Sequence, residues 1–222
     1  MGDAHPAGCT DLGVAHGQAG VLAALAYALN VGASGAGQGR SLLLGSLQTL
    51  RRHEQPGGPA HFGVAAEEPG GSRCAWCYGD LGMAAALQLA ARALDEPALE
   101  AWVERLLQSL SRRPVPSLGF SDAWLCHGSI GSAWLLRQLA PQRTALVDRF
   151  RRQQALEGPD GLLAALHAEE APDLSLLEGY AGLALALAEL QAAPEAGPPP
   201  LRWSLPLLAG RRALQALAPG RT

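Results

Sequence analysis

Long apolar blocks rich in alanine and leucine alternate along the chain with shorter stretches that mix apolar and charged positions. The four apolar blocks follow residues 20, 82, 131 and 182, and each is apolar around whole helical turns. Alanine and leucine are strong helix formers. A helix that is apolar on every side belongs in the interior, whereas an amphipathic helix belongs at the surface. The pattern therefore predicts an all-α protein with an inner layer of Ala/Leu helices.

The mixed stretches predict an outer layer. Residues 97–107 begin with a proline at the first turn and alternate charged with apolar positions at helical spacing. Residues 41–52 and 144–156 show the same pattern. If each apolar helix pairs with an amphipathic one, the helical hairpins stack into two concentric layers. We therefore expect a partial α/α toroid of about four helical-hairpin repeats, with inner Ala/Leu helices and outer amphipathic helices.

A Gly-x-x-Gly motif opens each apolar block and reveals an internal repeat. The leading glycines Gly17, Gly79, Gly128 and Gly179 stand 62, 49 and 51 residues apart, a period that accommodates two helices and their connections. Glycine permits tight turns and close backbone approach. We therefore expect the residue before each pair to point into a central cavity. For the fourth motif, where Glu178 precedes the pair, tight helix packing alone is an equally good explanation.

Three segments outside the helical pattern carry expectations of their own. Residues 31–39 are rich in glycine and predict a mobile loop. Residues 55–72 contain two Pro/Gly clusters and predict a long loop, and loops of that size in compact domains are often functional or disordered. Residues 201–217 follow a proline-rich break and are expected to form a closing helix.

Charge and composition exclude several classes of function. The formal net charge is −3, and the 17 basic residues, all arginine, form no cluster with aromatic residues, so no nucleic-acid partner is expected. The sequence shows no signal peptide, and no apolar run approaches the roughly 18–20 residues of a membrane helix. We therefore expect a cytoplasmic protein without membrane insertion. In a reducing compartment, the four cysteines favour metal or redox chemistry over disulfides.

Three potential metal ligands stand directly before the second and third glycine pairs. They are Cys77, Cys126 and His127, which supply two thiolates and one imidazole. Zinc accepts this set of donors, and three protein ligands leave the fourth tetrahedral position open for water or a substrate atom. An open position is typical of a catalytic zinc site rather than a structural one. The sequence therefore predicts an open zinc centre on a repeated helical frame.

A fourth thiol lies close to this candidate site. Cys74 forms a Cys-x-x-Cys pattern with Cys77, which on its own suggests a second ligand or a redox pair. Free cysteine is also among the most frequently buried residue types, where it behaves as a small apolar side chain. We favour the buried, inert thiol for Cys74 over a metal ligand.

The motifs together resemble the lanthionine synthetase C-like family, the cyclases of lanthipeptide biosynthesis. The resemblance rests on four segments of the chain, namely Ala15-His16-Gly17, Trp76-Cys77-Tyr78-Gly79, Cys126-His127-Gly128 and Leu177-Glu178-Gly179-Tyr180-Ala181-Gly182. It implies an α/α toroid with Zn²⁺ at its centre. It also implies a reaction in which a Cys thiol of a dehydrated precursor peptide adds to dehydroalanine or dehydrobutyrine and closes a (methyl)lanthionine thioether ring.

The resemblance also implies roles for individual residues. Cys77, Cys126 and His127 match the zinc ligands, with the substrate thiol in the fourth position. Three more residues match catalytic positions of the family, namely His16 as general acid/base, Arg73 as an active-site arginine and Tyr78 as a tyrosine beside the metal.

These implied roles agree with the chemistry of the reaction. A thiol of pKa about 8.5 is mostly protonated at neutral pH, and coordination to zinc deprotonates it. Addition of the thiolate makes an enolate, which His16 would protonate at the α-carbon and Arg73 would stabilise at the oxygen. The alternatives are a helix-capping role for His16 and a structural role for Arg73.

One difference from the family affects the expected activity. Family members are commonly longer or fused to a dehydratase, and an earlier hairpin that carries an active-site aspartate has no counterpart here. We therefore expect residues 1–222 to form a lanthionine synthetase C-like cyclase domain that lacks the N-terminal hairpins. A dehydratase or the missing N-terminal segment is then a candidate partner. The alternatives to a cyclase are a non-catalytic zinc-binding toroid that binds a peptide or thiol, and an inactive truncated remnant.

Overall fold

The structure, a computed structural model, describes residues 8–33, 35–68, 70–154, 158–192, 203–204 and 207. Within these ranges the chain forms eight α-helices and one short 3₁₀ helix, and its only strand-like pairing is an isolated bridge between Asp11 and Ala65. The helices are α1 (Gln18–Asn30), α2 (Ala36–His53), α3 (Asp80–Leu94), α4 (Pro97–Arg112), η1 (Val115–Leu118), α5 (Ser129–Leu139), α6 (Thr144–Arg151), α7 (Gly158–Ala168) and α8 (Tyr180–Gln191). No helix of this part of the chain has both the length and the apolar composition for crossing a membrane.

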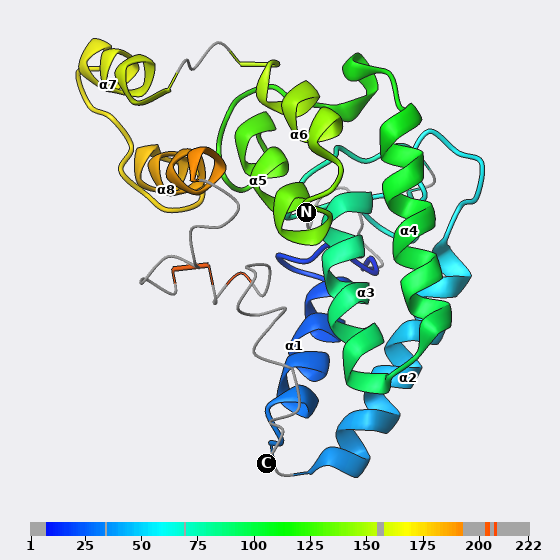
Figure 1. Cartoon of the computed structure of the whole chain (residues 1–222). Coiled ribbons are helices and arrows are strands. Elements are labelled where there is room, and N and C mark those ends of the chain that lie inside the picture. Colours follow the sequence, from blue (N-terminus) through cyan, green and yellow to red (C-terminus); the bar gives the residue numbers. More distant parts are fainter. Residues whose placement is uncertain are drawn as a thin grey trace.

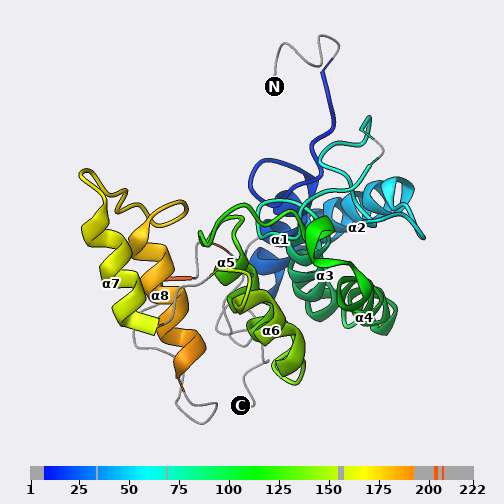
Figure 2. The same ribbon diagram turned by 90° about the horizontal axis from the view of Figure 1, so that it is seen from above.

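The helices form two layers of an open arc. The inner helices α1, α3, α5 and α8 pack in series, each against the next, and α2, α4, α6 and α7 each cover one of them from outside (Figures 1 and 2). The core runs along this inner series, where α3 and α5 are buried along almost their whole length. The predicted all-α partial toroid of four hairpins, with inner Ala/Leu helices and outer amphipathic ones, is confirmed.

Local sequence signals explain where the central hairpin bends. Helix α3 ends at Leu94 and is capped by Asp95, which adopts a left-handed conformation (φ 51°) and donates its N–H to carbonyl groups of the last turn. Two residues later Pro97 begins α4, and the Glu96 side chain accepts a hydrogen bond from the Ala98 N–H. Helix α4 then buries Leu99, Trp102 and four further apolar residues on one face. A tight hairpin and an amphipathic outer helix follow from these signals.

The helix boundaries differ from expectation at three places. Helix α2 begins at Ala36, so part of the glycine-rich segment 31–39 is helical. Gly39 packs closely against α1, since a Cβ atom added to it would lie 3.3 Å from the Leu29 side chain. Helix α6 ends at Arg151 rather than at residue 156, and α7 follows as an outer helix that the polar pattern did not predict. Most of the expected closing helix at 201–217 lies outside the described residues.

Both glycines of each motif are required by the loop that precedes them. At the second glycine of all four motifs, an added Cβ would overlap with the carbonyl oxygen of the residue six positions earlier. In the fourth motif that pair is Gly182 and Leu176, so its glycines serve the same loop geometry as the others. The leading Gly79 additionally has a φ of +90°, a backbone conformation that residues other than glycine rarely adopt. The motif is therefore a repeated loop-to-helix junction.

This geometry predicts opposite effects for two Gly-to-Ala changes. Gly182→Ala should destabilise the protein by about 3 kcal/mol, because the new methyl group must displace backbone rather than a flexible side chain. Gly45 lies inside α2 with open space around its Cβ position, so Gly45→Ala should instead stabilise by about 0.5–1 kcal/mol. Urea unfolding of both variants measures the two effects. Equal stability of the two variants would contradict the close approach at Gly182.

Candidate metal centre

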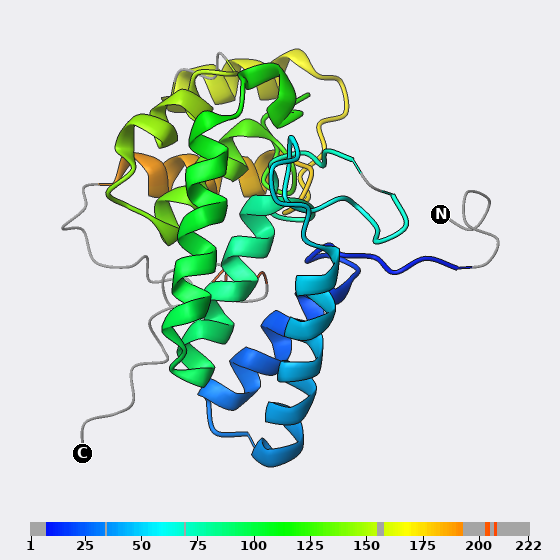
Figure 3. The same ribbon diagram turned by 90° about the vertical axis from the view of Figure 1, so that its right-hand side faces the viewer.

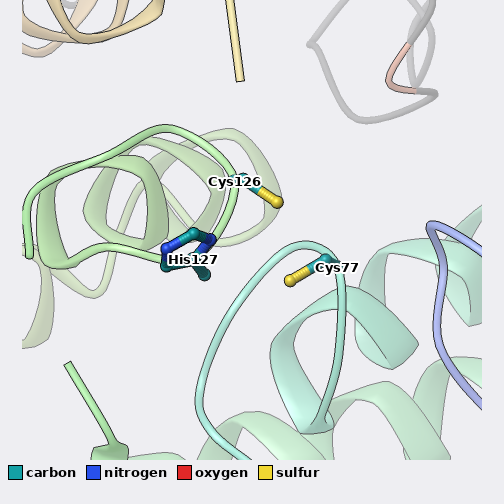
Figure 4. A group of neighbouring side chains, drawn as sticks. All are labelled: Cys77, Cys126 and His127. Atoms are coloured by element: carbon teal, nitrogen blue, oxygen red, sulfur yellow. The ribbon is translucent and has the colours of Figure 1, made fainter. Parts of the chain in front are cut away.

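Cys77, Cys126 and His127 come together at the start of two neighbouring inner helices. Cys77 lies in the loop before α3, and Cys126 and His127 lie directly before α5 (Figure 4). The sulfur atoms and one ring nitrogen all lie within 4.8 Å of one another. Both cysteines are buried, at 6% and 8% exposure, while the imidazole is half-buried. Two hairpins therefore supply one cluster of soft and borderline ligands.

The three donors fit a tetrahedral metal site. Zn–S bonds of about 2.3 Å place two ligand atoms about 3.8 Å apart at the tetrahedral angle. The separations here need shifts of about 1 Å at most, which side-chain rotation supplies. The two sulfur atoms lie well within the separation of about 7 Å that the predicted site requires, and the binding of a metal by these residues stays a prediction. Three protein ligands leave one corner for a fourth ligand.

The two thiols perturb each other in the metal-free state. A hydrogen bond from Cys126 lowers the pKa of Cys77, burial opposes this effect, and the charge of Arg73 adds to the lowering. The same hydrogen bond, burial and the charge of Cys77 together raise the pKa of Cys126. The pair thus accommodates one negative charge on Cys77 and resists a second one. A bound cation would relieve that restriction, because it favours both thiolates.

Equivalent backbone positions of the four motif loops are hydrogen-bonded in series. The Ala15 N–H lies 3.4 Å from the Cys77 oxygen, and the Cys77 N–H lies 3.4 Å from the Cys126 oxygen. The Cys126 N–H donates to the Leu177 oxygen at 2.9 Å. In each case the residue two positions before the leading glycine donates to its counterpart in the next repeat. We call this series the loop ladder; it fixes the two cysteine backbones side by side.

The long loop before Cys77 is anchored by hydrogen bonds to the first residue of α3. It gathers at the end of the helices where α1 and α3 begin (Figure 3). The fully buried Asp80 accepts hydrogen bonds from the N–H groups of His61 and Phe62, and it pairs with the buried Arg113 at 3.7 Å.

Cys74 is completely buried, and burial raises its pKa. The expected inert thiol is therefore found, outside the ligand cluster.

Tyr78 and Arg73, to which the family resemblance assigns catalytic positions, lie beside the cluster. The Tyr78 hydroxyl donates to Asp11 Oδ2 at 2.7 Å, and burial together with that carboxylate raises the pKa of Tyr78. Arg73 is exposed, and its charge lowers the pKa of both Cys77 and Cys126. An exposed cation beside these two thiols is suited to contact an anionic group of a bound ligand.

His16 and Glu178 stand directly before the first and fourth glycine pairs. His16 is exposed, and its side chain forms no hydrogen bond or ion pair with another described residue. The N-cap of α1 is Gly17 without a side-chain hydrogen bond, so the structure gives no capping role to His16. Glu178 is 62% exposed and places a carboxylate oxygen 3.7 Å from His127 Nδ1. The exposed His16 side chain is therefore accessible to a bound molecule.

Two aspartates beside the cluster were not identified from the sequence. Asp122 Oδ2 lies 3.1 Å from His127 Nε2, and Asp11 holds Tyr78 as described above. Both stand six residues before a leading glycine, and Asp173 occupies the same place in the fourth motif. That shared spacing is the signal by which they could have been found. The second motif has Arg73 at this position.

The fold and the cluster define a class of protein, an α/α toroid with a Cys/Cys/His group that could hold a metal ion at the start of two inner helices. The sequence profile of the family described as lanthionine synthetase C-like protein matches residues 3–196. The chain therefore belongs to the lanthionine synthetase C-like family, and the resemblance found in its motifs is confirmed. No curated protein sequence matches the chain.

One solved structure with a similar fold is that of nisin cyclase. It superposes with a TM-score of 0.68 at 24% sequence identity, and the alignment covers 96% of this chain and 53% of nisin cyclase. At this identity the likeness shows the shared α/α toroid fold. The chain spans about half the length of nisin cyclase.

Proposed function

We propose that this protein is a zinc-dependent lanthipeptide cyclase that forms (methyl)lanthionine rings in a dehydrated precursor peptide. Family membership supports the general class. The observation that supports this specific activity is the Cys77–Cys126–His127 cluster. Three protein ligands leave the fourth position of a tetrahedral zinc ion for the thiol of a substrate. The proposal treats residues 1–222 as one cyclase domain, with a dehydrated peptide as substrate and a dehydratase or further toroid hairpins as candidate partners.

The proposed roles follow from where the side chains lie. Cys77, Cys126 and His127 would hold zinc, which when bound lowers the pKa of a coordinated thiol. The substrate sulfur then forms a C–S bond to the β-carbon of dehydroalanine or dehydrobutyrine, and the electron pair of the C=C bond moves to the enolate. Arg73, whose charge already reaches both thiols, would stabilise the enolate oxygen.

His16 and Tyr78 would manage protons and orientation around this step. The exposed His16 would deliver a proton to the α-carbon, since its side chain has no hydrogen-bond or ion-pair partner among the described residues. Tyr78 is a donor fixed by Asp11, and it lies next to Cys77 in sequence. We propose that it lines the site beside the incoming sulfur. No atom is lost in the reaction, because the thiol proton and the added α-proton balance.

Ring closure by the zinc-loaded chain tests this proposal. Addition of a thiol within one peptide leaves the mass unchanged, so closure is measured as loss of alkylatable thiol in a synthetic peptide that contains dehydroalanine and cysteine. We expect thiol loss well above the rate without protein, with Cys126→Ala as the inactive control. Further toroid hairpins from a family member are added in a parallel reaction.

A second class of function is distinguished by the same assay. The alternative is a non-catalytic zinc-binding toroid that captures a peptide or thiol for another protein. Zinc-dependent binding of the peptide, with no loss of free thiol in either reaction, would favour that alternative over the cyclase. A chain that holds no stoichiometric zinc would instead favour an inactive remnant.

A further inference from the structure

The three motif aspartates make the same pair of backbone contacts. Their Oδ1 atoms accept from the N–H group two residues later, at 2.7 Å for Asp11, 3.0 Å for Asp122 and 2.7 Å for Asp173. Their main-chain oxygens accept from the N–H group seven residues later, at 2.8–2.9 Å. The first contact is an Asx turn, and the second closes the loop onto the first residue of the inner helix. Each aspartate thus shapes its own loop with only part of its hydrogen-bonding capacity.

The remaining carboxylate oxygen faces the site in two of the three motifs. Asp11 Oδ2 accepts from the Tyr78 hydroxyl at 2.7 Å, and Asp122 Oδ2 lies 3.1 Å from His127 Nε2. Asp122 Oδ2 also accepts from the Ser121 hydroxyl at 2.8 Å. Within the described residues, Asp173 Oδ2 has no such side-chain partner. The aspartate at this loop position therefore contacts a side chain of the candidate site in the first and third motifs. In the fourth motif it contacts only the backbone of its own loop.

The contact with Asp122 determines which nitrogen of His127 is available to a metal. An ionised carboxylate only accepts hydrogen bonds, so its oxygen at 3.1 Å from Nε2 favours the tautomer that carries the proton on Nε2. The neutral ring then presents its lone pair at Nδ1. Glu178 is the nearest carboxylate to Nδ1, and at 3.7 Å it is too far for a hydrogen bond. Nδ1 is thus the nitrogen whose lone pair is available to a metal ion.

We propose that Asp122 is a positioning residue that selects the Nδ1 tautomer of His127 for the metal, and that Asp11 positions Tyr78 by the same loop device. The proposal rests on the proposed function for its metal, yet the tautomer is a property of the metal-free chain. A ligating imidazole whose second N–H is fixed by a carboxylate is better oriented and more basic than a free one.

The variant Asp122→Asn tests this assignment. Its amide oxygen can keep the Asx turn to the Trp124 N–H, so that its NH₂ group faces His127 Nε2. A donor at that place favours the tautomer with the proton on Nδ1, which blocks the metal-binding nitrogen. We expect zinc affinity to fall about 10–100-fold, measured by competition with a chromophoric chelator.

The matched control is Asp173→Asn, which makes the same change at the equivalent loop position. Because Asp173 reaches no site side chain, we expect zinc affinity within about twofold of the wild type. Thermal unfolding of both metal-free variants controls for the loss of the turn. Equal zinc affinity of the two variants would overturn the proposal.

The ¹⁵N chemical shifts of His127 in the metal-free protein give an independent readout. We expect the proton on Nε2 in the wild type and on Nδ1 in Asp122→Asn. A wild-type ring protonated on Nδ1 would overturn the proposal even if the variant failed to fold. Absence of cyclase activity, with the expected tautomer and zinc affinities, would refute the proposed function and leave this assignment intact.

Discussion

Replacement of Cys126 by alanine is expected to abolish stoichiometric zinc binding. The change removes one of three donors and leaves Cys77 and His127 as a two-ligand site. The loss should exceed the about 10–100-fold that removal of an outer hydrogen-bonding partner costs, because a bond to the metal itself is lost. Elemental analysis after gel filtration measures the zinc content, and a chelator competition measures the affinity.

The matched control for this variant is Cys74→Ala. Cys74 is fully buried, its thiol lies outside the cluster, and only its main-chain oxygen accepts from Ser132. The control should retain one equivalent of zinc, which also separates a buried thiol from the Cys-x-x-Cys interpretation. Undiminished zinc in Cys126→Ala would show that the ligand set is wrong.

Replacement of His16 by asparagine is expected to slow ring closure by about 10²–10⁴-fold, the usual contribution of a positioned acid or base. Zinc content should be unchanged, since His16 does not belong to the cluster. Stability should also change little, because the side chain is exposed and does not cap α1. Thiol consumption in the dehydrated peptide measures the rate, with and without added toroid hairpins.

His167→Asn provides the control for His16. His167 is exposed in the last turn of the outer helix α7 and does not belong to the Cys/Cys/His cluster, so its replacement should leave zinc content and rate unchanged. Wild-type ring closure by zinc-loaded His16→Asn would remove this residue from the mechanism and leave water as the proton source. Loss of zinc together with the fold would indicate a structural role instead.

Much of the architecture could be predicted from the sequence. The apolar pattern indicates which helices lie in the inner layer and which in the outer layer, and the spacing of the motifs indicates the repeat. Helices apolar on all sides, such as α1 and α8, identify the inner layer, and Pro97 with its neighbouring charges identifies an outer helix. The start of α2 was missed because glycine-rich residues have low helix propensity, which packing against α1 overcomes here. Tertiary contacts of this kind are not encoded in a local pattern.

The ligand cluster could also be predicted, since donor type and place before a glycine pair suffice to name Cys77, Cys126 and His127. The supporting carboxylates could not be recognised in the same way. Asp122 is an ordinary loop residue until folding brings its second oxygen to His127. Its relation to Asp11 becomes visible only when the motifs are aligned six residues upstream of their glycines.

The loop ladder has a consequence for the order of folding events. In small zinc domains the ligands lie close along the chain, so the metal can drive a short segment to fold. Here Cys77 and Cys126 are 49 residues apart on different hairpins, and their peptide groups meet only through the ladder. Closing so long a loop carries an entropic cost that must be met before both thiols are adjacent. A metal ion held by these residues would therefore bind late in folding and stabilise an interface between repeats that packing has already assembled.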